Sequence, residues 1–172
     1  MRKFCLTIIV LVGFSKALFA QFGNCTASEM QTYTDRETGN TITILTDTLK
    51  NDRFLYQTDP MWTHDGKYLL FRSSSRANDK KIERTLPNGE KRSWTPTQIY
   101  FIEMATGQII QATEGPDLGS AFLANKSNRM FISRKEKEDW NMYVMDLDKF
   151  FADVKKGKVG KPTAYETLLG TF

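Results

Sequence analysis

The sequence is poor in the residues that build metal centres and disulfide frameworks. Its 172 residues include one histidine, His64, and two cysteines. A site that holds a divalent cation through several imidazoles is therefore excluded within this chain. Only Cys25 lies beyond the first 20 residues, so if those residues are removed no disulfide can form within the chain. The folded protein must then be stabilised by its core.

Long apolar runs are also lacking. The longest run, residues 4–14, has 11 residues, whereas a membrane-spanning helix needs about 20. The run follows Arg2-Lys3 and precedes a small-residue cleavage site that ends at Ala20. This order is typical of a secretory signal peptide. We predict that residues 1–20 are a signal peptide, that the mature protein is periplasmic or secreted, and that it has no membrane partner after cleavage.

An excess of positive charge is lacking once the predicted signal peptide is removed. The whole chain carries 24 basic and 20 acidic residues, a formal charge of +4. Three of the basic residues and none of the acidic ones lie in residues 1–20, which leaves 21 basic and 20 acidic residues. A nucleic-acid partner requires a concentrated basic face. The near-neutral balance therefore argues against nucleic acid as a partner.

Helical periodicity is lacking before residue 146, and short apolar runs bounded by turn residues are present instead. This pattern is typical of β-strands. Residues 30–47 predict a hairpin with its turn at Thr38–Asn40, because glycine and asparagine accept a positive φ. The stretch DPMWTHDGKYLLFRS, residues 59–73, predicts a short strand, a turn that contains Asp65-Gly66, and a buried strand.

The same order of short strands and turns occurs twice. The expected strands are 61–63, 67–72, 99–102 and 109–112 in the first copy, and 121–123, 130–132, 142–145 and 165–169 in the second. Tyr100 and Tyr143 occupy matching places 43 residues apart, and Tyr68 and Met130 occupy matching places 62 residues apart. The difference of 19 residues is the extra length of a polar loop, residues 73–97, in the first copy.

Turn residues in the polar loop, Pro87-Asn88-Gly89, predict that it contains a small hairpin of its own. A short helical turn is expected over residues 147–154. A repeat of about 40–45 residues with four short strands per copy is typical of β-propeller blades. We predict that residues 21–172 form an all-β fold, a partial β-propeller of about two and a half four-stranded antiparallel blades. The alternative is an antiparallel sandwich of unrelated hairpins.

Four segments carry a resemblance to known families. The segment DPMWTHDGKYLLF resembles the PD40 repeat of TolB-like β-propellers, in which Pro, any residue and Trp precede a turn that ends in Asp-Gly. Over residues 30–150 the chain resembles the amino-terminal blades of oligogalacturonate lyases, through TYTDRETGNTITILTD, FLYQTDPMWTHDGKYLLF, QIYFIEMATGQIIQATEG and NMYVMDLDKF, in the family's order. The resemblance implies a seven-bladed propeller that cleaves galacturonate oligomers by β-elimination, as in pectin degradation, with a manganese ion held largely by histidines.

The chain departs from that family pattern in length and in its histidines. Seven blades of about 40–45 residues need about 300 residues, about twice the length of residues 21–172. His64 lies in a predicted turn, and the family's metal ligands and catalytic residues belong to later blades. The resemblance therefore implies a fragment of an exported oligogalacturonate lyase-like protein that is inactive alone. We expect no catalytic residue, metal site or cofactor in this chain; manganese is implied for the complete family member.

A uronate oligosaccharide as partner requires groups that recognise a carboxylate and a sugar ring. Arg53, Arg72 and Arg134 lie near the ends of predicted strands, and a guanidinium can hold a carboxylate through two parallel hydrogen bonds. Tyr56 and Gln57, on the segment that enters the innermost strand, can hydrogen-bond a sugar. The alternative for each of the five is a solvated side chain or one that braces a loop.

Two tryptophans of the same regions, Trp94 and Trp140, can stack on sugars, but packing between blades is the expected use. Two other functions remain open from the sequence. One is a non-catalytic TolB-like scaffold, and the other is the propeller of a prolyl-oligopeptidase-like enzyme without its hydrolase domain. Histidines in further blades would favour the lyase, and a Gly-Xaa-Ser-Xaa-Gly elbow would favour the peptidase. For any of the three, uncovered sheet faces predict self-association or contact with further blades.

Overall fold

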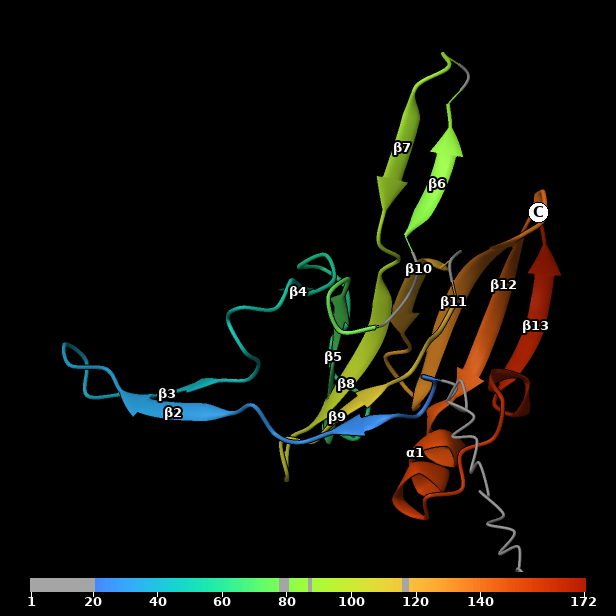
Figure 1. Ribbon diagram of the computed structural model, residues 1–172. Helices are drawn as coiled ribbons and strands as arrows, with labels where there is room; N and C mark the ends of the chain where they lie inside the picture. The colour runs from blue at the N-terminus through green and yellow to red at the C-terminus, as the bar shows by residue number, and fades with distance from the viewer. Residues whose placement is uncertain (1–20, 78–80, 87, 116–117) are drawn as a thin grey trace, which may run out of the picture.

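The computed structural model describes residues 21–77, 81–86, 88–115 and 118–172. The predicted signal peptide, residues 1–20, lies outside these ranges, as does Pro87 of the predicted loop turn. The described residues form two antiparallel sheets side by side, with a helix at one end and two projecting hairpins (Figure 1). No helix within these ranges is long and apolar enough to span a bilayer.

The first sheet has five strands in the order β1-β9-β8-β5-β4. Their bounds are β1 Cys25–Thr26, β4 Asp52–Arg53, β5 Tyr68–Ser73, β8 Gln98–Glu103 and β9 Ile109–Gln111. Both faces of β5 and β8 are buried, which explains their uninterrupted apolar runs. The expected strands at 67–72, 99–102 and 109–112 are confirmed.

The strand expected at 61–63 is shorter than predicted, because part of it belongs to the turn. Thr63 donates its N–H to the Tyr68 carbonyl (3.0 Å) and its hydroxyl to Asp65 Oδ1 (2.7 Å). Trp62 is left in a single bridge with Leu69. The expected turn is confirmed, and Gly66 adopts the positive φ (69°) that it requires.

The second sheet is a four-stranded meander in the order β10-β11-β12-β13. Its strands are β10 Leu118–Leu123, β11 Arg129–Glu136, β12 Asp139–Asp146 and β13 Glu166–Thr171. The four strands expected for the second copy are confirmed, and β11 and β12 are longer than predicted. A tight turn joins these two long strands, with Lys137 at φ 58°.

Helix α1, Leu147–Lys155, lies between β12 and β13 and is followed by a 3₁₀ turn, η1, Pro162–Ala164. Asp146 caps α1 by accepting the Lys149 N–H (3.0 Å), a contact that typically contributes about 1 kcal/mol. The helix buries Leu147, Phe150 and Phe151 in the core shared by both sheets. The Phe151 ring stacks on Tyr68 of the first sheet, with ring centroids 3.6 Å apart. The expected helical turn at 147–154 is therefore a capped helix that closes one end of the core.

Strand pairing corrects the predicted repeat by one residue. Tyr100 lies opposite Phe71, and its counterpart Tyr143 lies opposite Ile132. Phe71 and Ile132 therefore correspond, and the counterpart of Met130 is Leu69 rather than Tyr68. A shift of one residue exchanges the two faces of a strand, so the correction decides which faces are equivalent.

The two sheets stack head to tail. Phe71 packs in a cluster on the far side of the first sheet, with Tyr100 and Ile109, whereas its counterpart Ile132 packs into the core between the sheets. Corresponding residues thus face the same direction along the stack. A repeated unit produces this arrangement, and it leaves one face at each end of the stack for another neighbour.

Both predicted hairpins are present. Strands β2, Gln31–Thr34, and β3, Thr41–Ile44, pair across a turn in which Gly39 has φ 73°. Strands β6, Ile82–Thr85, and β7, Lys91–Trp94, form the hairpin expected within the polar loop. Figure 1 shows β2–β3 extending to one side of the sheets and β6–β7 rising above them. The expected all-β class is confirmed as antiparallel sheets with one short helix.

Candidate functional site

A cleft of about 570 Å³ opens between the two sheets beside the base of the β6–β7 hairpin. Four parts of the chain line it: residues 55–59 after β4, the end of β5, residues 94–99 that join β7 to β8, and the start of β10. Its volume lies in the range of small-molecule binding sites. Three of the five residues singled out from the sequence, Tyr56, Gln57 and Arg72, line this one cleft.

Strand alternation places Arg72 in the cleft. Arg72 lies on the same face of β5 as Tyr68 and Leu70, which belong to the core between the sheets. It is exposed, because it lies at the end of the strand where the core ends. Asp59 also lines the cleft, but among the described residues no acidic side chain forms an ion pair with Arg72. The guanidinium is therefore free to bind an anion.

Arg53 adds a second positive charge beside the first. It lies directly opposite Arg72 in the β4–β5 pairing, and both residues line a smaller cavity of about 250 Å³ next to the cleft. The Arg53 Nε–H donates to Asn51 Oδ1 at 3.3 Å. Two like charges directly opposite each other repel, and an anionic ligand between them would relieve that repulsion.

Aromatic and amide groups form the rest of the cleft wall. Tyr56 is 69% exposed and Trp94 is 39% exposed, and both rings contribute surface to the cleft wall. Gln57 adds an amide that can both donate and accept. From the sequence, packing between blades was the expected use of Trp94, and stacking on a sugar was the alternative. The structure places Trp94 at the cleft. Its position at the base of the inserted hairpin is the signal that could have identified it.

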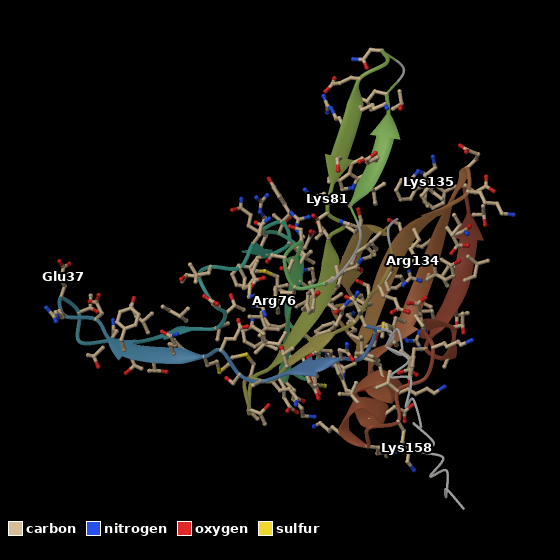
Figure 2. All side chains as sticks on the ribbon, in the orientation of Figure 1. Glu37, Arg76, Lys81, Arg134, Lys135 and Lys158 are labelled. Carbon is tan, nitrogen blue, oxygen red and sulfur yellow. The ribbon has the colours of Figure 1, made fainter. Side chains whose placement is uncertain are left out.

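Arg134 lies apart from this cleft, on β11 of the second sheet (Figure 2). Its guanidinium holds the buried Glu166 carboxylate through two hydrogen bonds, one of them 2.7 Å from Nη2 to Oε1. Burial lowers the pKa of Arg134, but the hydrogen bonds and charge of Glu166 outweigh burial and raise it. This geometry is the bracing role that was the alternative for Arg134.

The described residues do not fit a manganese site. They contain no group of three or more His, Cys, Asp or Glu side chains placed to hold a metal ion. The Nδ1 atom of His64 lies 3.1 Å from the Asn125 carbonyl oxygen, and the Asp65 N–H donates to Asn128 Oδ1 (3.3 Å). His64 therefore belongs to a contact between the turns of the two sheets.

The geometry defines what the cleft can do. The cleft offers the Arg72 guanidinium, which pairs with no acidic side chain of the described residues, a second guanidinium beside it, an amide and two aromatic rings. These groups suit a ligand with a carboxylate on a hydroxylated ring, since arginine forks match carboxylates and aromatic faces pack on the apolar faces of sugars. Among residues 21–77, 81–86, 88–115 and 118–172, no group of three or more His, Cys, Asp or Glu side chains is placed to hold a metal ion beside these groups.

Comparisons with known proteins point to one fold. No family model and no curated protein matches the chain. An oligogalacturonate lyase solved in complex with manganese matches with a TM-score of 0.54 and 22% identity, over 76% of this chain and 30% of that one. An oligogalacturonate lyase from Vibrio parahaemolyticus matches with a TM-score of 0.53 and 23% identity, over 75% and 29%. The chain spans under a third of either structure, and the similarity shows a shared fold.

Proposed function

We propose that this chain is part of an exported oligogalacturonate lyase-like protein and that its cleft binds uronate oligosaccharides. The observation that carries the proposal is the Arg72 guanidinium, which pairs with no acidic side chain of the described residues and lines one cleft with Gln57, Tyr56 and Trp94. The fold shared with two oligogalacturonate lyases supports the ligand class. The amino-terminal signal pattern supports export to the periplasm or outside the cell.

The proposed architecture is a partial β-propeller. Head-to-tail stacking of a five-stranded and a four-stranded antiparallel sheet supports it, because blades of a propeller repeat in this way. Besides the face at each end of the stack, an edge is open: β13 is the edge strand of the second sheet, and its Leu168 and Leu169 are each more than half exposed. Further blades, or a second copy of the chain, would pair with or pack on these surfaces.

The proposed role of this segment is binding without turnover. β-Elimination requires a cation at the uronate carboxylate, a base for the C5 proton and stabilisation of the leaving oxygen. Arg72 can serve the first requirement. The described residues offer no donor set for the metal that would acidify the C5 proton, and losing several kcal/mol of such stabilisation lowers a rate by several orders of magnitude.

The binding proposal is tested by calorimetric titration of the full chain with trigalacturonate and with maltotriose, a neutral ligand of the same length. We expect binding of the acid only. Arg72→Ala should weaken it about tenfold or more, because hydrogen bonds to a charged group contribute about 1.5–3 kcal/mol. Arg36→Ala, in the turn of the distant β2–β3 hairpin where Figure 2 labels Glu37, removes the same charge as a control. Unchanged affinity of Arg72→Ala would contradict the proposal.

Turnover is tested separately by near-ultraviolet absorbance, because elimination creates a C4–C5 double bond conjugated to the carboxylate. We expect no increase in absorbance when the chain is mixed with unsaturated digalacturonate and manganese. An increase that a chelator abolishes would place the chemistry in this chain or between its copies.

A scaffold is the second candidate function, favoured by one observation. Phe122 and Trp140 are each more than a third exposed on the second sheet, and Phe122 stacks on Phe131 with ring centroids 5.1 Å apart. Exposed apolar patches of this kind mark protein contacts. A chain that binds neither acidic nor neutral sugars and still binds a protein partner through this face would be the scaffold.

A further inference from the structure

The β6–β7 hairpin is an addition to the repeat. It is inserted between β5 and β8, whereas the corresponding strands of the second sheet, β11 and β12, are joined by a tight turn at Lys137. It forms a two-stranded sheet of its own, and the four residues of β7 are exposed. An isolated two-stranded hairpin is only marginally stable. Such an insertion adds little to the fold, and projecting loops on a rigid scaffold commonly carry binding residues.

The hairpin begins at the wall of the cleft. Trp94, the last residue of β7, lines the cleft together with Arg72. Arg92 lies on the same face of β7 as Trp94, because side chains two residues apart in a strand point to the same side. Two residues span about 7 Å of strand. An aromatic ring is therefore flanked by a guanidinium within the cleft and by another farther out along the hairpin.

The Arg92 guanidinium is available to a ligand. Its ion pair with Glu90 is 3.1 Å long, and both side chains are at least half exposed. An exposed pair of this kind contributes little to stability, so a ligand carboxylate can replace Glu90. The hairpin sequence, residues 81–94, carries four basic and two acidic residues. Figure 2 places the exposed Lys81 at the base of the hairpin.

We propose that the β6–β7 hairpin extends the cleft into a second subsite, in which Arg92 binds the carboxylate of another acidic unit of the same oligosaccharide and so selects for chain length. The inference rests on the proposed uronate binding at Arg72. Arg72 holds the carboxylate of one unit, Trp94 supports the ring of the following unit, and Arg92 holds the carboxylate of the unit after that. The ligand class is an oligomer with a regularly repeated anionic group.

Chain-length dependence tests this subsite. The full chain is titrated with monogalacturonate and trigalacturonate, and we expect the trimer to bind at least tenfold more tightly. Arg92→Ala should remove that advantage while leaving affinity for the monomer unchanged. Lys91→Ala is the matched control, because it removes one positive charge from the same strand on the opposite face. Arg92→Lys should restore part of the advantage, since it keeps the charge and loses the fork.

The outcomes separate the two proposals. If neither ligand binds the wild-type chain, the proposed uronate binding fails. If both bind through Arg72 but Arg92→Ala keeps the trimer advantage, the second subsite alone is overturned. Equal losses from Arg92→Ala and Lys91→Ala would also overturn it, because they would show a diffuse charge effect. Arg92→Gln, which keeps most of the side chain, gives the same comparison if Arg92→Ala unfolds.

The source of the anionic group is distinguished by two more ligands of equal length. Methyl-esterified trigalacturonate should lose the Arg92-dependent advantage, because its carboxylates are blocked. A sulfated neutral-sugar trimer should show less than half of that advantage if carboxylates are the ligand. A sulfated trimer that binds more tightly than trigalacturonate would overturn the assignment to uronates.

Discussion

The two sheets share a strand order and differ at corresponding positions. Arg72 of β5 corresponds to Ser133 of β11, because Phe71 and Ile132 correspond. Arg72 is exposed and lines the cleft, whereas Ser133 is 8% exposed and its hydroxyl accepts the Ser120 N–H at 2.7 Å. The first sheet also carries the inserted hairpin. The candidate site therefore arises where the first copy departs from the repeat, and the second copy shows what the repeat requires for packing alone.

The largest expected effect concerns the buried arginine that anchors the first sheet. The Arg76 side chain is 7% exposed and forms ion pairs of 2.6 Å with both Glu29 and Asp52. Arg76→Ala would leave two carboxylates uncompensated, which typically costs about 3–5 kcal/mol. Urea denaturation should show this loss. Arg76→Lys, which keeps the charge, should lose less, and a loss below about 1 kcal/mol for Arg76→Ala would show that the ion pairs do not anchor this sheet.

Exchanging the residues at the corresponding positions tests the comparison itself. Ser133→Arg should destabilise the chain by about 3 kcal/mol, because it forces a long charged side chain into a packed site. A side chain at Gly119 would meet Ser133 Oγ at 2.5 Å, so no space is available there. Arg72→Ser should change stability by less than about 0.5 kcal/mol, because Arg72 is exposed. Equal costs for the two substitutions would contradict the assigned correspondence.

Acid should act more strongly on the turn of the first sheet than on that of the second. Burial raises the pKa of Asp65, but hydrogen bonds from Lys67 and Thr63 outweigh it and lower the pKa from 3.8 to about 2. The stability that this depressed pKa gives is present above pH 4 and is lost as the pH falls toward 2. The turn at residues 125–128 contains no acidic residue.

Between pH 4 and 2, the free energy of unfolding should therefore fall by about 1–2 kcal/mol less in Asp65→Asn than in the wild type. Melting temperatures measured across this range should show the smaller fall. Asp139→Asn, at the start of β12, is a control at another exposed acid. Above pH 5, the melting temperatures of both variants should change with pH in the same way as that of the wild type. An unchanged acid transition in Asp65→Asn would show that this carboxylate does not stabilise the fold.

The smallest expected effect on stability is at the free edge of the second sheet. Leu169 is 54% exposed on β13, so Leu169→Lys should change the free energy of unfolding by less than about 0.5 kcal/mol. It should reduce self-association in light scattering, because a charge on an edge strand opposes strand pairing. Thr38→Lys, in the β2–β3 turn, is a charge-matched control that should leave self-association unchanged.

Local signals were sufficient to predict much of the fold. Short apolar runs and turn residues located the four strands of the second sheet, β5, β8 and β9 of the first, the β6–β7 hairpin and the region of α1. Strands β1 and β4, of two residues each, carry no apolar run and were not predicted. Arg72 was selected because it lies near a strand end, and Tyr56 and Gln57 because they lie on the segment that enters the innermost strand. The structure brings these three into one cleft. Arg134 was selected by the same position near a strand end, but it pairs with Glu166 instead, so position along a strand alone does not identify the residues of the cleft.

Long-range pairing was not available from the sequence. Glu166, the partner of Arg134, lies 32 residues later in the sequence, after α1. No local sequence pattern connects the two residues. The one-residue correction to the repeat required the pairing of Tyr143 with Ile132, because apolar residues occupy both faces of these strands. The length of the strand predicted at 61–63 was overestimated, because Thr63 belongs to the turn. Its N–H donates to the Tyr68 carbonyl, and its hydroxyl oxygen accepts the Tyr68 N–H.

The central claim is that departure from the repeat at Arg72 creates an anion-binding site, and arginine side-chain NMR tests it most directly. The Nε–H resonances of Arg72, Arg76 and Arg134 are followed while trigalacturonate is added to the full chain. We expect the Arg72 resonance to shift with saturation, and those of Arg76 and Arg134 to stay fixed, because their guanidiniums already hold Glu29, Asp52 and Glu166. A saturating shift of Arg134 with no movement of Arg72 would contradict the account.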